Sequence, residues 1–102
     1  MPTVSEALQQ LDRELARARQ SGCGVLKLIH GYGSSGAGGE IRIAAQRRLA
    51  DMASRGEIRA CIFGEDWAKS DERTWALINA WPDLKRDTDL GRRNQGITIV
   101  VL

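Results

Sequence analysis

The sequence predicts an α/β fold, and three observations carry that prediction. A capped amphipathic helix leads directly into a short β-rich run, the same helix-strand order then recurs, and the chain ends on a third run of branched apolar residues. Helices that alternate with strands over short connections are typical of parallel strands joined by right-handed crossovers. We therefore expect mostly parallel strands with helices packed on them.

The size and composition indicate one domain, residues 1–102. A chain of 102 residues with 42% hydrophobic and 27% charged residues buries one core but not two. No apolar run approaches the roughly 18 residues of a membrane span, and the start MPTVSEAL lacks the features of a signal peptide. We expect a cytoplasmic protein with no membrane partner, in which Cys23 and Cys61 are reduced.

The first helix is predicted from its cap and its apolar stripe. Thr3-Val4-Ser5-Glu6 fits a capping box, in which a hydroxyl and a glutamate satisfy the first backbone N–H groups. The buried face is expected to consist of Val4, Leu8, Leu11, Leu15 and Ala18. Ser21 and Gly22 end the helix, since glycine tolerates a left-handed C-terminal turn.

The next helix-strand pair follows the same logic. Residues 25–29 (VLKLI) are short, β-rich and mostly apolar, which indicates a largely buried strand. After a glycine-rich loop, a second helix is expected over 40–54, and Gly56 stops it. Residues 58–63 then form the second strand.

The region after residue 63 is less regular. A short helix is expected from Asp71 to Trp81, ended by Pro82, and residues 83–96 are polar and rich in turns. Trp67, Trp75 and Trp81 are more typical of a core or an interface than of base stacking, so a homodimer is kept open. Residues 97–102 (ITIVVL) form the last strand.

The helix that begins at residue 3 or 4 has no strand before it, although a chain of this pattern usually opens with one. Two alternatives stay open. Either the sheet is small, or the natural protein begins upstream of Met1 and the N-terminal strand is missing here.

Charge is unevenly distributed along the chain. Residues 13–59 carry nine Lys or Arg against four acids, whereas residues 65–89 carry seven acids against four basic residues. Arginine outnumbers lysine twelve to three, and the guanidinium fork suits phosphate recognition. The net charge of +2 argues only weakly for a polyanionic partner, and solvated helix faces explain the same pattern.

The glycine-rich loop LIHGYGSSGAGGE (28–40) is the strongest candidate site. Residues 31–36 match G-x-G-x-x-G between a strand and a helix, where successive backbone N–H groups bind anions. A dinucleotide-binding site needs an acidic residue at the end of the next strand, about 20 positions after the glycines, and this chain has none there. A Walker loop needs Gly-Lys-Ser/Thr at its end, which is also missing. A small-nucleotide binder remains an alternative.

His30, the only histidine, ends the first strand, where α/β sheets place their ligand sites. Its imidazole can donate to a phosphate oxygen or transfer a proton. The alternative is a ring that only hydrogen-bonds a neighbouring carbonyl. One histidine and two distant cysteines give no metal-ligand spacing, so no metal site and no cofactor are predicted, and a metal requirement stays open.

Three segments together resemble the Smr (small MutS-related) domain family. His30-Gly31-Tyr32-Gly33, preceded by Leu28-Ile29, is similar to the family's HGxG motif. Residues 3–8 (TVSEAL) resemble the start of its first helix, and residues 96–102 resemble its last strand. The similarity covers most of the chain except residues 64–90, which look like an insertion. An LDLHG-like strand, common in relatives before the first helix, has no counterpart here.

The resemblance implies a two-layer sandwich with a small mixed, mostly parallel sheet, similar to the C-terminal domain of translation initiation factor three. It also implies a DNA or RNA partner and, in several relatives, phosphodiester nicking. In that version His30 is the general acid or base, and the loop N–H groups and an arginine stabilise the phosphate. A binding module without turnover is the alternative. The candidate phosphate-binding residues are Gly31, Tyr32, Gly33, Ser34, Ser35, Gly36, Arg42, Arg92, Arg93 and Asn94.

Overall fold

Three α-helices, two short 3-10 helices and three strands make up the part of the chain that the structure describes. The structure is a computed structural model that describes residues 2–32 and 39–102. In chain order the elements are α1 (Val4–Gln20), β1 (Val25–Ile29), α2 (Glu40–Ser54), β2 (Ala60–Phe63), η1 (Gly64–Asp66), α3 (Glu72–Ala80), η2 (Pro82–Arg86) and β3 (Ile97–Val101). Within these described ranges no helix has the length and apolar character needed to cross a membrane.

The sheet has the strand order β1-β3-β2, and β3 runs antiparallel to both neighbours. Leu28 lies opposite Thr98, and Ile62 lies opposite Ile99. The prediction of a mostly parallel sheet is therefore wrong. The crossover through α2 does bring β1 and β2 into the same direction, but β3 is inserted between them.

The central position of β3 follows from its composition. The middle strand of a sheet covered on both faces is the most completely buried, and it favours a continuous apolar run. Ile97 to Val100 are all buried, whereas β1 and β2 contain mostly partly buried residues. The last strand is thus the most apolar of the three, and it forms the middle of the sheet.

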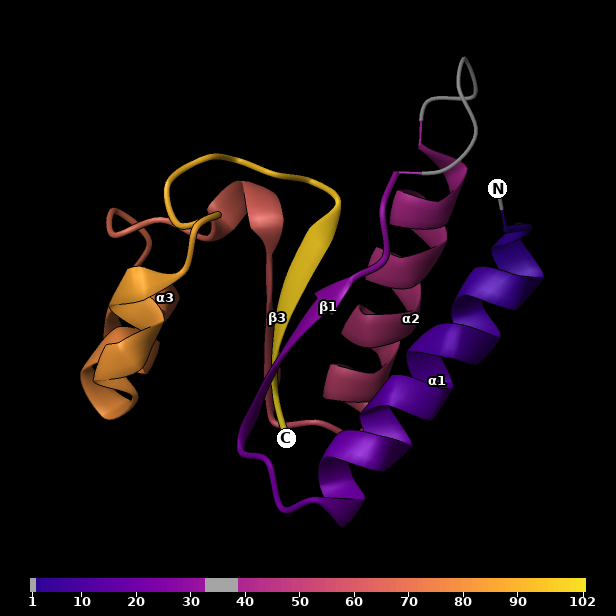
Figure 1. Cartoon of the computed structure of the whole chain (residues 1–102), viewed down its shortest axis with the longest axis horizontal. Coiled ribbons are helices and arrows are strands. Elements are labelled where there is room, and N and C mark those ends of the chain that lie inside the picture. Colours follow the sequence, from indigo (N-terminus) through magenta and orange to yellow (C-terminus); the bar gives the residue numbers. More distant parts are fainter. Residues whose placement is uncertain (1, 33–38) are drawn as a thin grey trace.

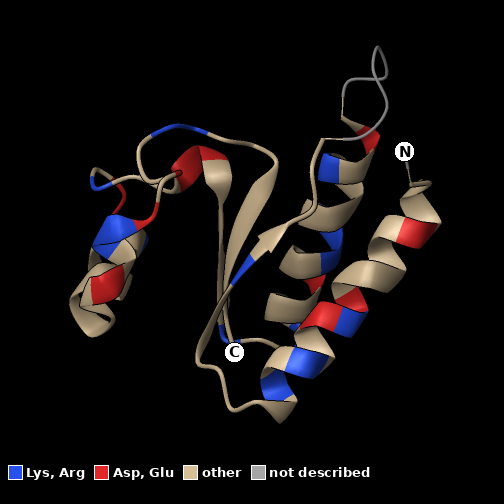
Figure 2. Cartoon of the chain, viewed as in Figure 1, with Lys and Arg blue, Asp and Glu red and all other residues tan. Residues whose placement is uncertain are grey.

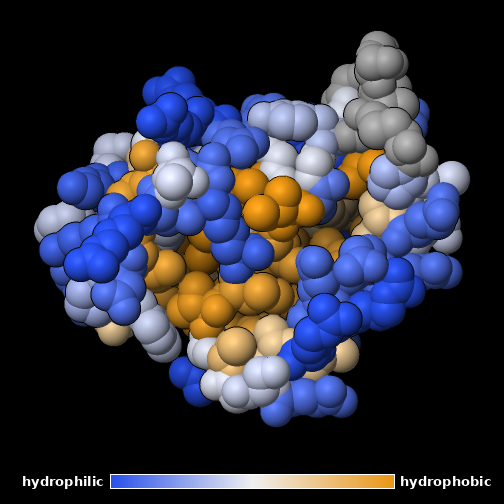
Figure 3. Space-filling view, viewed as in Figure 1, coloured by the Kyte–Doolittle hydropathy of each residue, from blue (hydrophilic) through white to orange (hydrophobic). Residues whose placement is uncertain are grey.

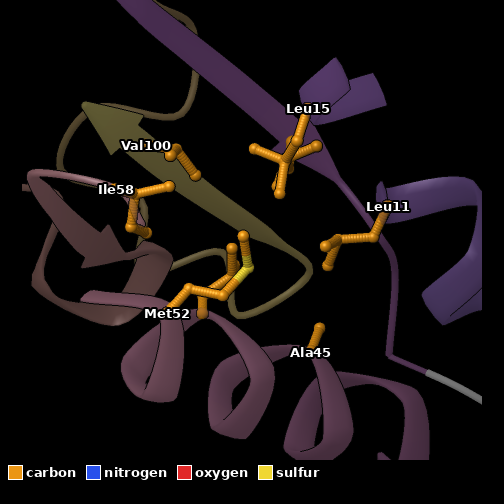
Figure 4. Packing of buried hydrophobic residues seen from close by; sticks show 8 residues of the cluster. Leu11, Leu15, Ala45, Met52, Ile58 and Val100 are labelled. Carbon is orange, nitrogen blue, oxygen red and sulfur yellow. The ribbon is translucent and has the colours of Figure 1, made fainter. Parts of the chain in front are cut away.

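Helices α1 and α2 cover one face of the sheet (Figure 1). Their apolar stripes meet the sheet in one buried cluster, several members of which are labelled in Figure 4. The cluster contains Leu11, Leu15, Leu28, Ala45, Leu49, Met52, Ile58 and Val100. The capping box of α1 is confirmed, because Glu6 N donates to Thr3 Oγ1 and Thr3 N donates to Glu6 Oε1.

The opposite face is covered by the segment 64–90. Figure 1 shows α3 on the far side of the sheet from α1 and α2. Trp67, with 0% of its surface exposed, packs with Leu77 and Ile78 against Ile62, Ile97 and Ile99. The molecule therefore has helices on both faces, and the two-layer prediction is corrected to three layers. The residues that we interpreted as an insertion supply the second apolar cover.

Strand β1 is an edge of the sheet, and apolar side chains reach the surface beside it. In Figure 3 they gather between the two helical layers, over the strand that lies in front in Figure 1. Ile29, the last residue of β1, is 74% exposed. The end of this strand therefore stands at an open part of the surface, and His30 follows it directly.

Candidate nucleic-acid interface

Three segments meet at the C-terminal end of β1: the residues that follow the strand, the turn 91–96 before β3, and the start of α2. The N–H groups of His30 and Gly31 both donate to the carbonyl oxygen of Gly96, at 3.1 and 2.9 Å. The antiparallel pairing of β1 with β3 brings these residues together. The turn before the last strand therefore lies directly beside His30.

Tyr32 joins all three segments. Its hydroxyl donates to Asn94 Oδ1 at 2.9 Å, and its carbonyl accepts from Arg42 N at 3.0 Å. Asn94 also accepts from Gly96 N and donates to Asp89, at 2.9 and 3.0 Å. The Asn94 amide is therefore engaged in shaping the turn, which is a role that the sequence did not suggest.

The His30 ring is held at both nitrogens. Nδ1 lies 2.8 Å from the Gly31 carbonyl oxygen, and Nε2 lies 3.0 Å from Thr98 Oγ1. Because a carbonyl oxygen only accepts, Nδ1 carries the hydrogen. In the neutral ring Nε2 is then the acceptor, so the Thr98 hydroxyl donates to it. His30 does hydrogen-bond a neighbouring carbonyl, as one of the two alternatives proposed. The ring also contacts Thr98, so the carbonyl is not its only partner.

Thr98 is a site residue that sequence reasoning missed. It lies on the central strand with 0% of its surface exposed, opposite Leu28 and thus on the same face of the sheet as α1 and α2. A hydroxyl in the run ITIVV is the one signal that pointed to it, since a buried polar group needs a partner.

The environment of His30 favours its neutral form. Partial burial lowers the pKa of the ring below its ordinary value of 6.5, and the charge of Arg42 acts in the same direction. The hydrogen bond to the Gly31 carbonyl opposes this shift, because it favours a protonated Nδ1. At neutral pH the ring is therefore uncharged, with its one hydrogen on Nδ1.

Arg42 lies close to His30 and is linked to a polar network. Its Nη1 donates to Gln46 at 3.3 Å, Gln46 donates to Glu65 at 2.8 Å, and Gln95 donates to the other oxygen of Glu65 at 3.1 Å. This network ties α2 to η1 and to the turn 91–96. Gln46, Glu65 and Gln95 carry no motif, so sequence reasoning missed them.

Arg92 and Arg93 are exposed on the same turn, but neither contacts His30 among the described hydrogen bonds. Arg93 has a left-handed backbone, with φ of 55°, and it borders a polar hollow of about 670 Å³ with Glu65, Asp66 and Asp71. Among the described residues, Arg42 is the charged group that lowers the pKa of the His30 ring.

Two glycines allow the backbone segments to come this close. A Cβ on Gly64 would lie 1.7 Å from the carbonyl oxygen of Asn94. A Cβ on Gly96 would lie 3.1 Å from both the Asn94 side chain and the Tyr32 ring. Gly64 therefore requires the smallest side chain, whereas a Cβ at Gly96 would need its neighbours to shift by a few tenths of an ångström. Gly33, Ser34, Ser35 and Gly36 lie outside the described residues.

The charges at this end of the molecule are mixed. Figure 2 shows basic residues on the turn before β3 and near the start of α2, with the acidic residues of η1 beside that turn and an acidic residue in the first turn of α2. Chemically, guanidinium groups and an imidazole among the described residues can bind an anion. The neighbouring carboxylates limit where an anion can approach. Within residues 2–32 and 39–102, no three His, Cys, Asp or Glu side chains group as metal ligands.

No protein-family model, curated protein or solved structure matches the chain.

Proposed function

We propose that the end of β1, the start of α2 and the turn 91–96 together bind the phosphate backbone of DNA or RNA. The observation that carries this proposal is their junction, in which His30 and Gly31 share the Gly96 carbonyl and Tyr32 bonds both Arg42 and Asn94. Arginine-rich surfaces bind backbone phosphates bidentately and without reading sequence.

The resemblance to the Smr family supports the same function. Of the residues His30-Gly31-Tyr32-Gly33 that carry the HGxG similarity, the first three lie at this junction and Gly33 lies outside the described residues. The turn before the last strand lies there too. As part of this proposal, the fold is taken to be related to that of the C-terminal domain of translation initiation factor three.

Phosphodiester cleavage is the second candidate, and His30 is the observation that favours it. A neutral imidazole at neutral pH is the form that accepts a proton as a general base. Both ring nitrogens are already engaged, however, by Gly31 and Thr98. Binding therefore needs fewer changes at the site than turnover does, and we place it first.

Binding is tested by titrating fluorescent single-stranded RNA, single-stranded DNA and duplex DNA with the protein at several salt concentrations. We expect affinity to fall as salt rises, because bound arginines release counterions from the phosphates. Arg42→Gln and the double substitution Arg92→Gln with Arg93→Gln are expected to weaken binding and to flatten the salt slope by about one per lost phosphate contact.

Arg86→Gln is the matched control, because Arg86 is exposed at the end of η2 and loses the same charge. If Arg86→Gln weakens binding as much as Arg42→Gln, the contact is general charge attraction and the assigned site is wrong. Affinity that is indifferent to salt would also contradict a phosphate site.

Cleavage is tested on supercoiled plasmid and on single-stranded RNA with the wild type and His30→Ala. Loss of cleavage in His30→Ala assigns the reaction to this ring. Equal cleavage by both proteins removes His30 from the reaction.

A further inference from the structure

The hydrogen bonds of His30 restrict how the ring can contact a phosphate. A phosphodiester oxygen only accepts hydrogen bonds, so the ring must offer it an N–H group. The hydrogen on Nδ1 is already given to the Gly31 carbonyl, which is 2.8 Å away in the adjacent residue. Nε2 carries no hydrogen in this state, because it accepts from Thr98.

A phosphate contact through Nε2 therefore needs two changes. The ring must take up a proton at Nε2, so that it becomes imidazolium while Nδ1 keeps its bond to Gly31. The Thr98 hydroxyl, which now donates to Nε2, must give up that bond. Thr98 is fully buried on the central strand, so it gives up the bond by rotating Oγ1 away from Nε2 about its Cα–Cβ bond, without a shift of the strand.

We propose that His30 is a proton-coupled phosphate contact, in which a bound nucleic-acid phosphate replaces Thr98 at Nε2 and one proton is taken up from solvent. Thr98 is the positioning residue of this contact, since it holds the ring ready in the free protein. This inference rests on the proposed function, and it adds a pH dependence to it.

The charged groups around the ring act in both directions. Arg42 from α2 disfavours the imidazolium in the free protein. Glu6, Arg13 and Glu14 of α1 line a groove of about 330 Å³ that His30 also borders. The facing side of the sheet contributes Thr98, which does not titrate. A phosphate monoanion beside Nε2 offsets the Arg42 charge and stabilises the added proton.

Proton uptake is measured by calorimetric titration of a short single-stranded oligonucleotide in two non-phosphate buffers with different ionisation enthalpies. For the wild type at neutral pH we expect uptake of up to one proton, and affinity that rises by at most about tenfold per unit fall in pH. His30→Gln, which keeps an amide N–H but does not titrate, is expected to bind without uptake.

Thr98→Val and Thr98→Ser separate the positioning role from packing. Valine keeps the shape of threonine but has no hydroxyl. Thr98→Val therefore removes the hydrogen bond to His30 Nε2, which in this proposal exists only in the protein without bound nucleic acid. Oligonucleotide affinity is then expected to rise about fivefold, from one hydrogen bond that no longer has to be broken. Thr98→Ser keeps the hydroxyl and is expected to bind as the wild type does. Thermal unfolding of both variants checks that they are folded.

Nitrogen NMR gives a readout that needs no ligand. His30 is the only histidine, so the ring signals belong to one residue. We expect a hydrogen on Nδ1 alone in the free protein and on both nitrogens in the complex.

Binding without proton uptake, or equal affinity of wild type and Thr98→Val, would overturn this inference and leave the phosphate site standing. A wild type that binds no oligonucleotide would overturn the proposed function itself.

Discussion

The two faces of the sheet are covered by different kinds of structure. On one face, α1 and α2 are regular helices of 17 and 15 residues, and their buried cluster is almost entirely aliphatic. On the other face, α3 has nine residues, and one buried tryptophan fills much of the space. A long helical stripe makes the first face, whereas the second depends on individual side chains.

Polar anchors make up for the irregularity of the second face. Asp87 accepts from Trp67 Nε1 at 2.9 Å and pairs with Lys27 of β1 at 2.8 Å. Asp89 forms a second ion pair with Lys27. Because Lys27 is a strand residue, these bonds tie the segment 64–90 directly to the sheet. A layer with only one short α-helix therefore depends on specific hydrogen bonds and ion pairs to hold its position on the sheet.

Of the substitutions that test the difference between the two faces, removal of Trp67 is expected to lower the free energy of unfolding most. Trp67→Ala leaves a cavity at the centre of the second face, and we expect unfolding free energy to fall by about 3–5 kcal/mol. Denaturant unfolding measures the loss. Trp75→Ala is the control, because Trp75 is 49% exposed and its loss should cost much less. Similar losses from both variants would show that the second face does not depend on Trp67.

Gly64→Ala tests the contact between the start of η1 and the turn 91–96. The added Cβ meets the Asn94 backbone, which cannot move without shifting the turn. We expect a loss of about 1–3 kcal/mol and weaker nucleic-acid binding together. Gly22→Ala is a useful contrast, because Gly22 has a positive φ but no atom near its Cβ. A stable Gly64→Ala variant with normal binding would contradict the close approach.

Asp87→Ala removes the anchor of the second face. The Trp67 indole N–H loses its partner and Lys27 keeps only Asp89, so we expect a loss of about 1–3 kcal/mol. Thermal unfolding compares it with Asp83→Ala, which removes an exposed acid of η2. Equal melting temperatures in the two variants would mean that the anchor contributes nothing.

The smallest effect concerns the polar pair on the first face, His30 and Thr98. The folded state lowers the pKa of His30, so the unfolded chain binds a proton more readily. Stability from this residue is therefore complete above pH 6.5 and falls as the pH drops below that value. The difference in unfolding free energy between wild type and His30→Gln, measured against pH, isolates it. A difference that does not change with pH would contradict the shift.

The predictability of the two faces differs for a physical reason. The helix expected over 40–54 is confirmed at both ends, and the Thr3 capping box is present, because both depend on residues close in sequence. A core or interface position was expected for Trp67, but its partners were not predictable, since Ile97 and Ile99 lie some thirty residues later. The expected parallel sheet failed because local periodicity says nothing about which strand enters the middle.

For the candidate site, too, the sequence predicted some features and not others. The position of His30 at the end of a strand followed from the pattern of the chain. The nearness of the turn 91–96 depends on the antiparallel pairing of β1 with β3, which that pattern did not predict. The partners of His30 were not predictable either, because Thr98 is 68 residues away and reaches the ring only through the pairing of β1 with β3.

By itself the sequence determined the helices, the strands and the segment that carries the only histidine, since these follow from periodicity and capping between near neighbours. Only the tertiary structure decided the strand order, the second apolar cover and the hydrogen-bonding state of His30. Each of these depends on contacts between residues far apart in the chain, and burial, rather than local preference, selects them.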